Sequence, residues 1–121
     1  MIQFTLGWPP KELSPNARLH WGKVSRAKKI YRKACWVICL EQIQDQVIPS
    51  PGEGSNLILE LEFVAPDRRS YDRDNLGARM KSGIDGMCDA LKIDDKVFGT
   101  VVCTLATERI GGFVNVRIKG E

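Results

Sequence analysis

The segment from Leu57 to Val64 constrains the fold of this chain more than any other. Its odd-numbered positions are all large and apolar, whereas Glu60 and Glu62 occupy even-numbered positions. Successive side chains of a β-strand point to opposite faces of the sheet, so this alternation predicts a strand with one face in the core. The chain therefore contains a sheet, and the other segments are interpreted around this strand.

Two longer segments are predicted to be helices. The first extends from about Ser25, a candidate N-cap, to Gln46 and contains neither Gly nor Pro. Its apolar residues recur near helical spacing, at Ile30, Ala34, Val37, Ile38, Ile43 and Val47. The second begins between Asp74 and Ala78 and ends near Leu91. It has an apolar stripe of Leu76, Met80, Ile84, Met87 and Leu91, and an opposite polar side of Asp74, Lys81, Asp85 and Asp89.

Three shorter segments are predicted to complete the sheet. Ile2 to Leu6 forms a strand that ends at the turn sequence Gly7-Trp8-Pro9-Pro10. Val97 to Glu108 and Phe113 to Ile118 flank Gly111-Gly112 and are expected to pair as a hairpin. Residues 48–55, rich in Pro, Gly and Ser, form a linker. The order strand, helix, strand, helix, strand, strand predicts a single domain over residues 1–121 of the α/β (α+β) class, with a mixed sheet of about four strands and two main helices.

Composition and length exclude several classes of protein. The chain has 121 residues, 43% of them apolar and 27% charged, which is typical of one ordinary globular domain and not of a disordered chain. No stretch approaches the roughly 18 apolar residues of a membrane span, and the first residues lack the features of a signal peptide. We therefore expect a cytoplasmic protein without a membrane partner. The four cysteines show no Cys-x-x-Cys spacing and are expected to be buried or incidental thiols.

Positive charge is concentrated in two places, although the net charge is only +3. Seven basic residues and no acidic ones lie between Leu13 and Leu40, and three arginines surround Tyr71. Such clusters are typical of proteins that contact a phosphate backbone, because Arg and Lys form charge-assisted hydrogen bonds and release counterions. A solvated helix face is the alternative. The expected DNA-binding residues are Arg18, Lys23, Arg26, Lys28, Lys29, Arg68, Arg69 and Arg73.

Acidic residues occur in two pairs next to these clusters. Asp72 and Asp74 are two positions apart, and Asp94 and Asp95 follow the second helix. In extended backbone, residues i and i+2 share one face, so both carboxylates of the first pair can address one ion. Mg²⁺ prefers oxygen ligands and is commonly held by one or two carboxylates together with substrate phosphates. The pattern indicates a metal-dependent phosphodiesterase site; the alternative is that the aspartates are loop residues paired with nearby arginines.

Other chemistries fit the sequence less well. A calcium-binding EF-hand loop beginning at Asp72 would place Leu76 and Gly83 at positions that need oxygen ligands. His20 is the only histidine and has no nucleophile context, so it is expected to be a loop or DNA-facing residue. Two alternatives stay open: a nucleic-acid-binding module without catalysis, and a small metal-binding regulator that uses Cys35, Cys39 and Cys88.

Taken together, these features resemble the RusA family of Holliday junction resolvases, which are small phage and bacterial endonucleases. The resemblance extends from Leu6 to about Phe98 and rests on Gly7-Trp8-Pro9-Pro10, Asn16, Pro66-Asp67-Arg68-Arg69, Asp72-x-Asp74-Asn75, Lys81 with Asp85, and Asp94-Asp95. It implies that Asp72, Asp74 and Asp95 are essential carboxylates that bind Mg²⁺, or Mn²⁺ in its place, with Asp94 beside them and Lys81 as the family's helix lysine. It also implies a homodimer that resolves four-way DNA junctions by paired nicks in a bacterial cell or phage-infected host, without a small-molecule cofactor.

One position departs from the family pattern. Ala78 stands where the family lysine is expected, and Lys81 comes three residues later. Seven residues separate Asp74 from Lys81, which is about two helical turns or roughly 10 Å. Arg73 and Arg79 are therefore alternatives for the role of this lysine.

Overall fold

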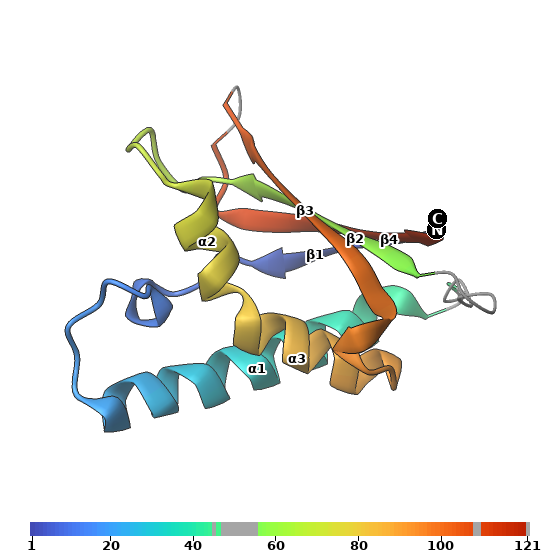
Figure 1. Ribbon diagram of the computed structural model, residues 1–121, viewed down its shortest axis with the longest axis horizontal. Helices are drawn as coiled ribbons and strands as arrows, with labels where there is room; N and C mark the ends of the chain where they lie inside the picture. The colour runs from blue at the N-terminus through green and yellow to red at the C-terminus, as the bar shows by residue number, and fades with distance from the viewer. Residues whose placement is uncertain (45, 47–55, 108–109, 121) are drawn as a thin grey trace.

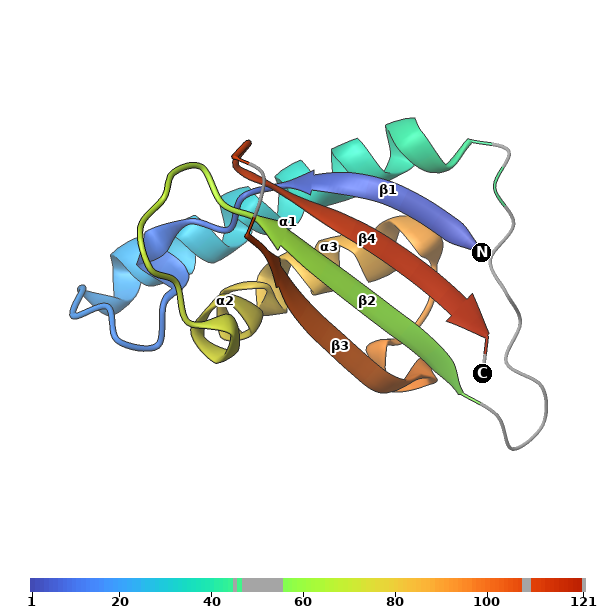
Figure 2. The same ribbon diagram turned by 90° about the horizontal axis from the view of Figure 1, so that it is seen from above.

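The sheet has the strand order β1-β4-β2-β3 (Figure 2). A computed structural model describes residues 1–44, 46, 56–107 and 110–120, and within them the four strands are β1 (Ile2–Gly7), β2 (Leu57–Val64), β3 (Phe98–Ala106) and β4 (Phe113–Gly120). β4 is antiparallel to β1 and β2, whereas β3 is parallel to β2. The sheet is therefore mixed, and the predicted α+β class is confirmed. The predicted linker at 48–55 lies outside the described residues.

The predicted hairpin between the last two strands is wrong. β3 lies at one edge of the sheet, and β4 is inserted between β1 and β2. Their connection passes over the end of β2, where the amide N–H groups of Gly111 and Gly112 donate to the carbonyls of Ala65 and Val64 (2.8 and 2.9 Å). Gly112 has φ +81°, a conformation that favours glycine. The apolar side chains of β4 explain its central place, since they are almost completely buried: Val114, Val116 and Ile118.

The α-helices all cover the same face of the sheet in the described part of the chain (Figure 1). They are α1 (Trp21–Ile43), α2 (Arg73–Arg79) and α3 (Lys81–Leu91), and two short 3-10 turns, η1 (Lys11–Leu13) and η2 (Asp95–Val97), lie between elements. At 23 residues α1 is the longest, and no helix in the described ranges combines the length and hydropathy that a bilayer crossing requires. The opposite face of the sheet carries charged and polar side chains, such as Glu60 paired with Lys119 (2.6 Å).

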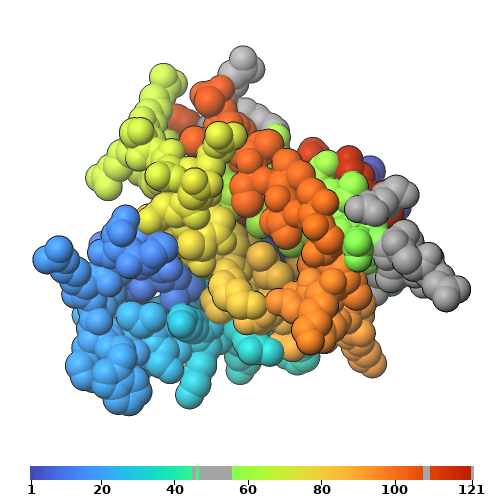
Figure 3. All heavy atoms as spheres, viewed as in Figure 1, coloured from blue at the N-terminus to red at the C-terminus, as the bar shows by residue number. Residues whose placement is uncertain are grey.

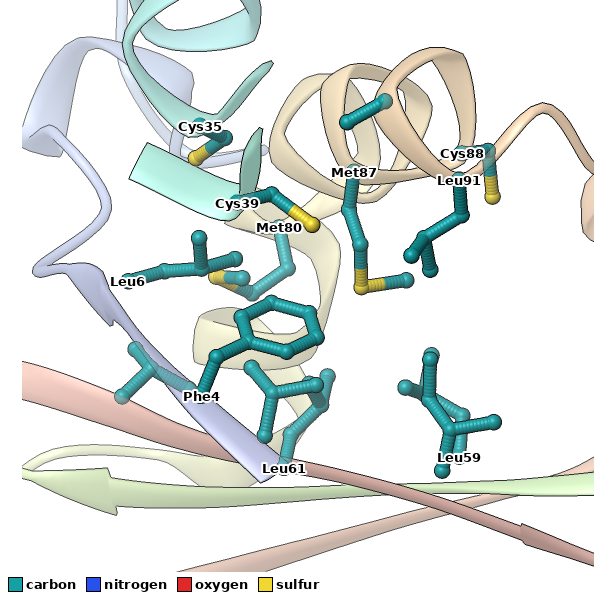
Figure 4. Packing of buried hydrophobic residues seen from close by; sticks show 14 of the residues in the cluster. Phe4, Leu6, Cys35, Cys39, Leu59, Leu61, Met80, Met87, Cys88 and Leu91 are labelled. Carbon is teal, nitrogen blue, oxygen red and sulfur yellow. The ribbon is translucent and has the colours of Figure 1, made fainter. Parts of the chain in front are cut away.

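Both the start and the buried face of α1 differ from the prediction. The helix begins four residues before Ser25, and the Nδ1 atom of its N-cap His20 accepts a hydrogen bond from the N–H of Gly22 (3.1 Å). Of the predicted apolar positions, Ile30, Ala34 and Val37 are exposed, Ile38 and Ile43 are half-buried, and Val47 is not described. The buried residues are instead Tyr31, Cys35 and Cys39, which are spaced four apart and therefore lie on one face of the helix. Cys35 and Cys39 belong to the packed core in Figure 4.

The predicted second helix is broken into α2 and α3 at Met80. The N–H of Met80 bonds to the carbonyls of Gly77 and Ala78, which tightens the end of α2. The predicted apolar stripe still faces the core, because Leu76, Met80, Met87 and Leu91 are buried and Ile84 is half-buried. The hydroxyl of Tyr31 donates to the carbonyl of Gly7 (2.7 Å) and lies 3.3 Å from the sulfur of Met80, so the break is tied to α1 and β1.

The outer edge of β1 is covered by two glutamine side chains of the α1 region. The Gln42 amide accepts from the N–H of Thr5 (2.8 Å) and donates to its carbonyl (2.7 Å). Gln46 makes the same pair of bonds to Gln3 (2.8 and 3.0 Å). These amides occupy the groups that another strand would use, so this edge is closed to strand pairing.

Replacing Gln42 by Ala is expected to lower the free energy of unfolding by about 1 kcal/mol, because two hydrogen bonds to the β1 backbone are lost. Hydrogen exchange of the Thr5 amide should accelerate in the same variant. Urea unfolding and amide exchange measure the two effects. Glu41→Ala, on the exposed side of α1, is the matched control and should change neither. Unchanged exchange at Thr5 in the Gln42 variant would contradict the role of the glutamine.

Candidate functional site

Asp72 begins α2 and caps it. Its backbone is extended (φ −92°, ψ 123°), and its Oδ1 accepts from the N–H groups of Asp74 (2.8 Å) and Asn75 (3.3 Å). Such a cap stabilises a helix by about 1 kcal/mol. The second oxygen of Asp72 is not used by the cap. Asp72 therefore combines a structural role with an exposed negative charge.

Asp74 lies in the first turn of α2, so the expectation that both aspartates occupy extended backbone holds for Asp72 only. Its carboxylate is exposed and lies near Cys103 of β3. Burial raises the pKa of the Cys103 thiol, and the Asp74 carboxylate raises it further. Within the described residues neither Asp72 nor Asp74 makes an ion pair. The predicted alternative, in which neighbouring arginines neutralise these two aspartates, is thus not what the described residues show.

The second acidic pair lies at η2. Asp94 caps this turn by accepting from the N–H of Lys96 (3.0 Å). The Nζ of Lys81 lies 3.1 Å from Oδ2 of Asp95 and 3.5 Å from Oδ1 of Asp85. Its hydrogen bond lowers the pKa of the Asp95 carboxyl, and the two carboxylates together raise the pKa of Lys81. The Lys81 side chain is 70% exposed, so this ion pair is open to solvent.

The two acidic pairs do not form one cluster in the structure. No three His, Cys, Asp or Glu side chains among the described residues lie close enough together to share a metal ion. Asp72 and Asp74 sit at the beginning of α2, whereas Asp94 and Asp95 follow α3. Of the four predicted metal ligands and Lys81, the structure places Asp95 and Lys81 in direct contact. A metal ion at Asp72 and Asp74 would therefore need its other ligands from water or substrate, as Mg²⁺ commonly has.

A hollow opens beside the Asp72 carboxylate, between η1 and α2. We name it the Asp72 pocket; its volume is about 580 Å³, and its walls include Trp8, Asn16, Arg69, Tyr71, Asp72 and Arg79. The ring of Trp8 packs edge-on against Tyr71, with centroids 5.3 Å apart. The Tyr71 hydroxyl donates to Asp67 (3.0 Å), which also accepts from the N–H of Arg69 (3.0 Å). These contacts fix the loop that carries Arg68 and Arg69 into α2.

A polar network that the sequence did not reveal holds the pocket together. The side chains of Ser14 and Asn75 exchange a hydrogen bond (2.9 Å from Asn75 Nδ2 to Ser14 Oγ), and the Arg79 Nε donates to Asn75 Oδ1 (3.1 Å). Lys11 of η1 also lines the pocket. Neither Ser14 nor Lys11 belongs to a spaced motif, so only the fold brings them to Asp72. For Asn75, its place in the Asp74-Asn75 sequence of the family resemblance was the one feature of the sequence that could have indicated a role in the site.

The predicted DNA-binding residues are all exposed, but they occupy different parts of the surface. Arg26, Lys28 and Lys29 lie on α1, and Arg73 begins α2. Arg68 and Arg69 line a further hollow of about 520 Å³ near the end of β3, and Arg69 also lines the Asp72 pocket. Arg32, from the same basic stretch, forms a two-bond ion pair with Asp89 of α3 (2.8 and 3.0 Å), so its charge is already balanced. Arg18, in the loop before α1, and Lys23, in the first turn of α1, lie beside η1.

The cysteines fit the prediction of buried thiols. Cys35, Cys39 and Cys88 are buried, and Cys103 is partly buried. Burial raises the pKa of Cys35 to about 11 and those of Cys39 and Cys88 to about 12. Metal ions bind the thiolate form, which such pKa values disfavour at neutral pH. The metal-binding regulator that uses these cysteines therefore has no support among the described residues.

Replacing Lys81 by Met is expected to raise the pKa of Asp95 toward the ordinary range of an aspartate. The folded-state pKa is lowered in the wild type, so the pair contributes stability above the unfolded-state pKa of Asp95 and loses it as the pH falls through the folded-state value. An NMR titration of the side-chain carboxyl measures the shift. Asp89, whose pKa Arg32 lowers, is the internal control and should not move. An unchanged Asp95 pKa would contradict the contact.

No protein-family model matches the chain. A protein of Xylella fastidiosa (strain Temecula1 / ATCC 700964), described as an uncharacterized protein, is 43% identical to it over 98 residues. The matched region is 81% of this chain and 63% of the Xylella protein. The chain thus spans less than two thirds of the length of this relative.

Proposed function

We propose that the protein is a Mg²⁺-dependent, structure-selective endodeoxyribonuclease of the RusA type that resolves four-way DNA junctions. The observation that carries this proposal is the pair of carboxylates at the start of α2: Asp72 lines a cationic pocket, and Asp74 follows in the first turn of the helix. Both carboxylates are exposed and make no ion pair within the described residues, although Arg69 and Arg79 line the same pocket. A divalent cation would balance the two acidic charges, and the arginines would balance a phosphate.

The chemistry divides among the residues of this region. Asp72 and Asp74 would hold the metal through carboxylate oxygens, and water and substrate oxygens would complete its coordination, because Asp94 and Asp95 do not form one cluster with them in the described structure. The bound ion would lower the pKa of an attacking water and stabilise the leaving oxygen. Arg79, held by Asn75, and Lys81, in contact with Asp95, would stabilise charge on the reacting phosphate. Arg68 and Arg69 would position the strand through its phosphates.

A labelled mobile four-way junction, incubated with the purified protein with and without Mg²⁺, tests this proposal. Paired, symmetric nicks that require the metal are expected, and mapping of the cuts on all strands detects them. Mn²⁺ is expected to replace Mg²⁺. Absence of any metal-dependent product on branched or linear DNA would exclude the nuclease.

A second function, nucleic-acid binding without catalysis, is favoured by one observation. Lys81 already neutralises Asp95, and the described acidic residues do not form a cluster of three. A protein of this kind would bind the junction with the same affinity in EDTA and in Mg²⁺, and all of its DNA would stay uncut. The cleavage assay therefore separates the two functions.

Two nicks related by symmetry require two active sites, so the proposal includes a homodimer. Edge strand β3 is a suitable contact surface, because Val101 and Val102 are 51% and 38% exposed. The β1 edge is closed by Gln42 and Gln46, which favours pairing at β3. Sedimentation equilibrium is expected to give twice the 13.6 kDa mass of the chain. A cytoplasmic location also stays a prediction.

A further inference from the structure

A second hollow adjoins the Asp72 pocket on the side toward α1. We name it the Lys23 pocket; its volume is about 570 Å³, and its walls include Lys11, Glu12, Arg18, Leu19, Lys23 and Arg79. Lys11, Ser14, Asn16 and Arg79 line both pockets, so the two hollows adjoin along these residues, and we name the pair together the groove. In the space-filling view the N-terminal segment (blue) lies against α2 (yellow) (Figure 3).

The groove has an excess of positive charge that the described residues do not balance. Five cations line it, Lys11, Arg18, Lys23, Arg69 and Arg79, against the two carboxylates of Glu12 and Asp72. Only Arg69 among the five has a carboxylate within ion-pair distance in the described part of the chain, Asp67 at 3.8 Å. The five come from separate elements: η1, the loop before α1, α1 itself, the loop before α2, and α2.

Among the described residues, Arg79 is the one of these five cations whose side chain donates a hydrogen bond to another side chain. Its side chain is half-buried, and its Nε is held by Asn75, which Ser14 holds in turn. The two terminal nitrogens of its guanidinium make no hydrogen bond to a described residue and are left to face the groove. A guanidinium fixed in this way can bind a phosphate through two parallel bonds with little loss of side-chain entropy.

We infer that this groove binds one phosphodiester strand of DNA and leads it from the start of α1 to Asp72. The cations are distributed along two joined hollows and do not converge on one point, which suits successive phosphates better than a single anion. Apolar groups such as Leu19 and Trp8 lie between them and can contact sugars and bases. One part of the inference rests on the proposed function: that the strand leads to a cleavage site at Asp72.

The test is a measurement of junction binding in EDTA at several salt concentrations, with fluorescence anisotropy as the readout. Each phosphate contact that is lost should weaken binding about eightfold near 0.1 M salt and reduce the slope of log affinity against log salt by about 0.9. Arg79→Gln and Lys23→Gln are expected to show one such step each, and the double variant two steps. Lys119→Gln, a lysine paired with Glu60 on the opposite face of the sheet, is the matched control and should bind as the wild type does. Thermal unfolding confirms that each variant is folded.

Three results would overturn the inference. The first is wild-type affinity and salt slope in the folded double variant. The second is displacement of the junction by millimolar inorganic phosphate at constant ionic strength, which would indicate a site for a free anion. The third is a wild-type protein that binds no DNA. Failure of the nuclease proposal would give a different result. The wild type would then show DNA binding that depends on Arg79 and Lys23 but no Mg²⁺-dependent cleavage. That result would support the DNA-binding groove and exclude the nuclease activity.

Discussion

Asp74→Asn is expected to lower the rate of Mg²⁺-dependent junction cleavage by about 100-fold or more, because a charged metal ligand is removed. Junction binding in EDTA should be unchanged or slightly tighter, since the lost carboxylate repels phosphate. Asp74 lies in the first turn of α2, where a negative charge interacts favourably with the helix dipole, so a stability loss of up to about 1 kcal/mol is expected. Single-turnover cleavage and anisotropy measure the two functional effects.

Asp89→Asn is the matched control for this variant. Asp89 pairs with Arg32 between α3 and α1 and lies outside both pockets described above, so its substitution should leave cleavage at the wild-type rate. Cleavage by Asp74→Asn at the wild-type rate would remove Asp74 from the site.

Asp72 requires two substitutions, because it caps α2 as well as carrying charge. Asn caps a helix about as well as Asp does, so Asp72→Asn should lose cleavage and keep stability. Asp72→Ala should lose both, with about 1 kcal/mol less free energy of unfolding. Equal stability of the two variants would show that the cap contributes little, and the loss of cleavage in Asp72→Asn would still report on the carboxylate.

Local patterns predicted the elements of this fold better than their arrangement. The alternation in β2 and the apolar stripe of Leu76, Met80, Met87 and Leu91 are each properties of a few neighbouring residues, and both predictions were confirmed. The Gly111-Gly112 pair is also a local signal, and it indicated a hairpin. β4 instead pairs with β1 along one edge and with β2 along the other, and no local pattern specifies these partners.

The candidate site shows the same division. The caps that Asp72 provides at the start of α2 and Asp94 at the start of η2 follow from their own neighbours, since Asp is a preferred N-cap residue. The contact of Lys81 with Asp95 joins residues 14 positions apart, and the groove joins Lys11 to Arg79 across a much longer interval. Such contacts depend on how η1 and η2 pack against the helices, which spacing along the chain does not determine.

The buried face of α1 was predicted wrongly, and the reason for this error also predicts a large loss of stability in a glycine variant of α3. Hydropathy favours Ile30 and Val37 as core residues, yet the structure buries Tyr31 and Cys35 and exposes both. The partner helix α3 presents Gly83 and Gly86 to this face, so α1 approaches closely and has room only for its small or flat side chains. A Cβ at Gly86 would lie 2.1 Å from the carbonyl oxygen of Arg32, a backbone atom that cannot rotate away.

Gly86→Ala is therefore expected to lower the free energy of unfolding by about 2 to 4 kcal/mol, because the two helices must separate and their packing is lost. The higher helix propensity of Ala opposes this by about 1 kcal/mol and does not cancel it. Gly83→Ala should cost less, since its Cβ would meet the Tyr31 ring at 2.6 Å and the ring can shift. Urea unfolding measures the free energy of unfolding of both variants, provided that its dependence on urea concentration is the same as in the wild type.

Gly77→Ala provides the matched control within the same helical region. Its Cβ would lie 3.4 Å from the Cys103 sulfur, an ordinary contact, so the gain in helix propensity should leave the protein unchanged or stabilise it by up to about 1 kcal/mol. The expected order of stability is Gly77→Ala, then Gly83→Ala, then Gly86→Ala. Because the three substitutions add the same methyl group, this order depends only on what each methyl group meets. Equal stability of all three would mean that α1 and α3 are not in close backbone contact.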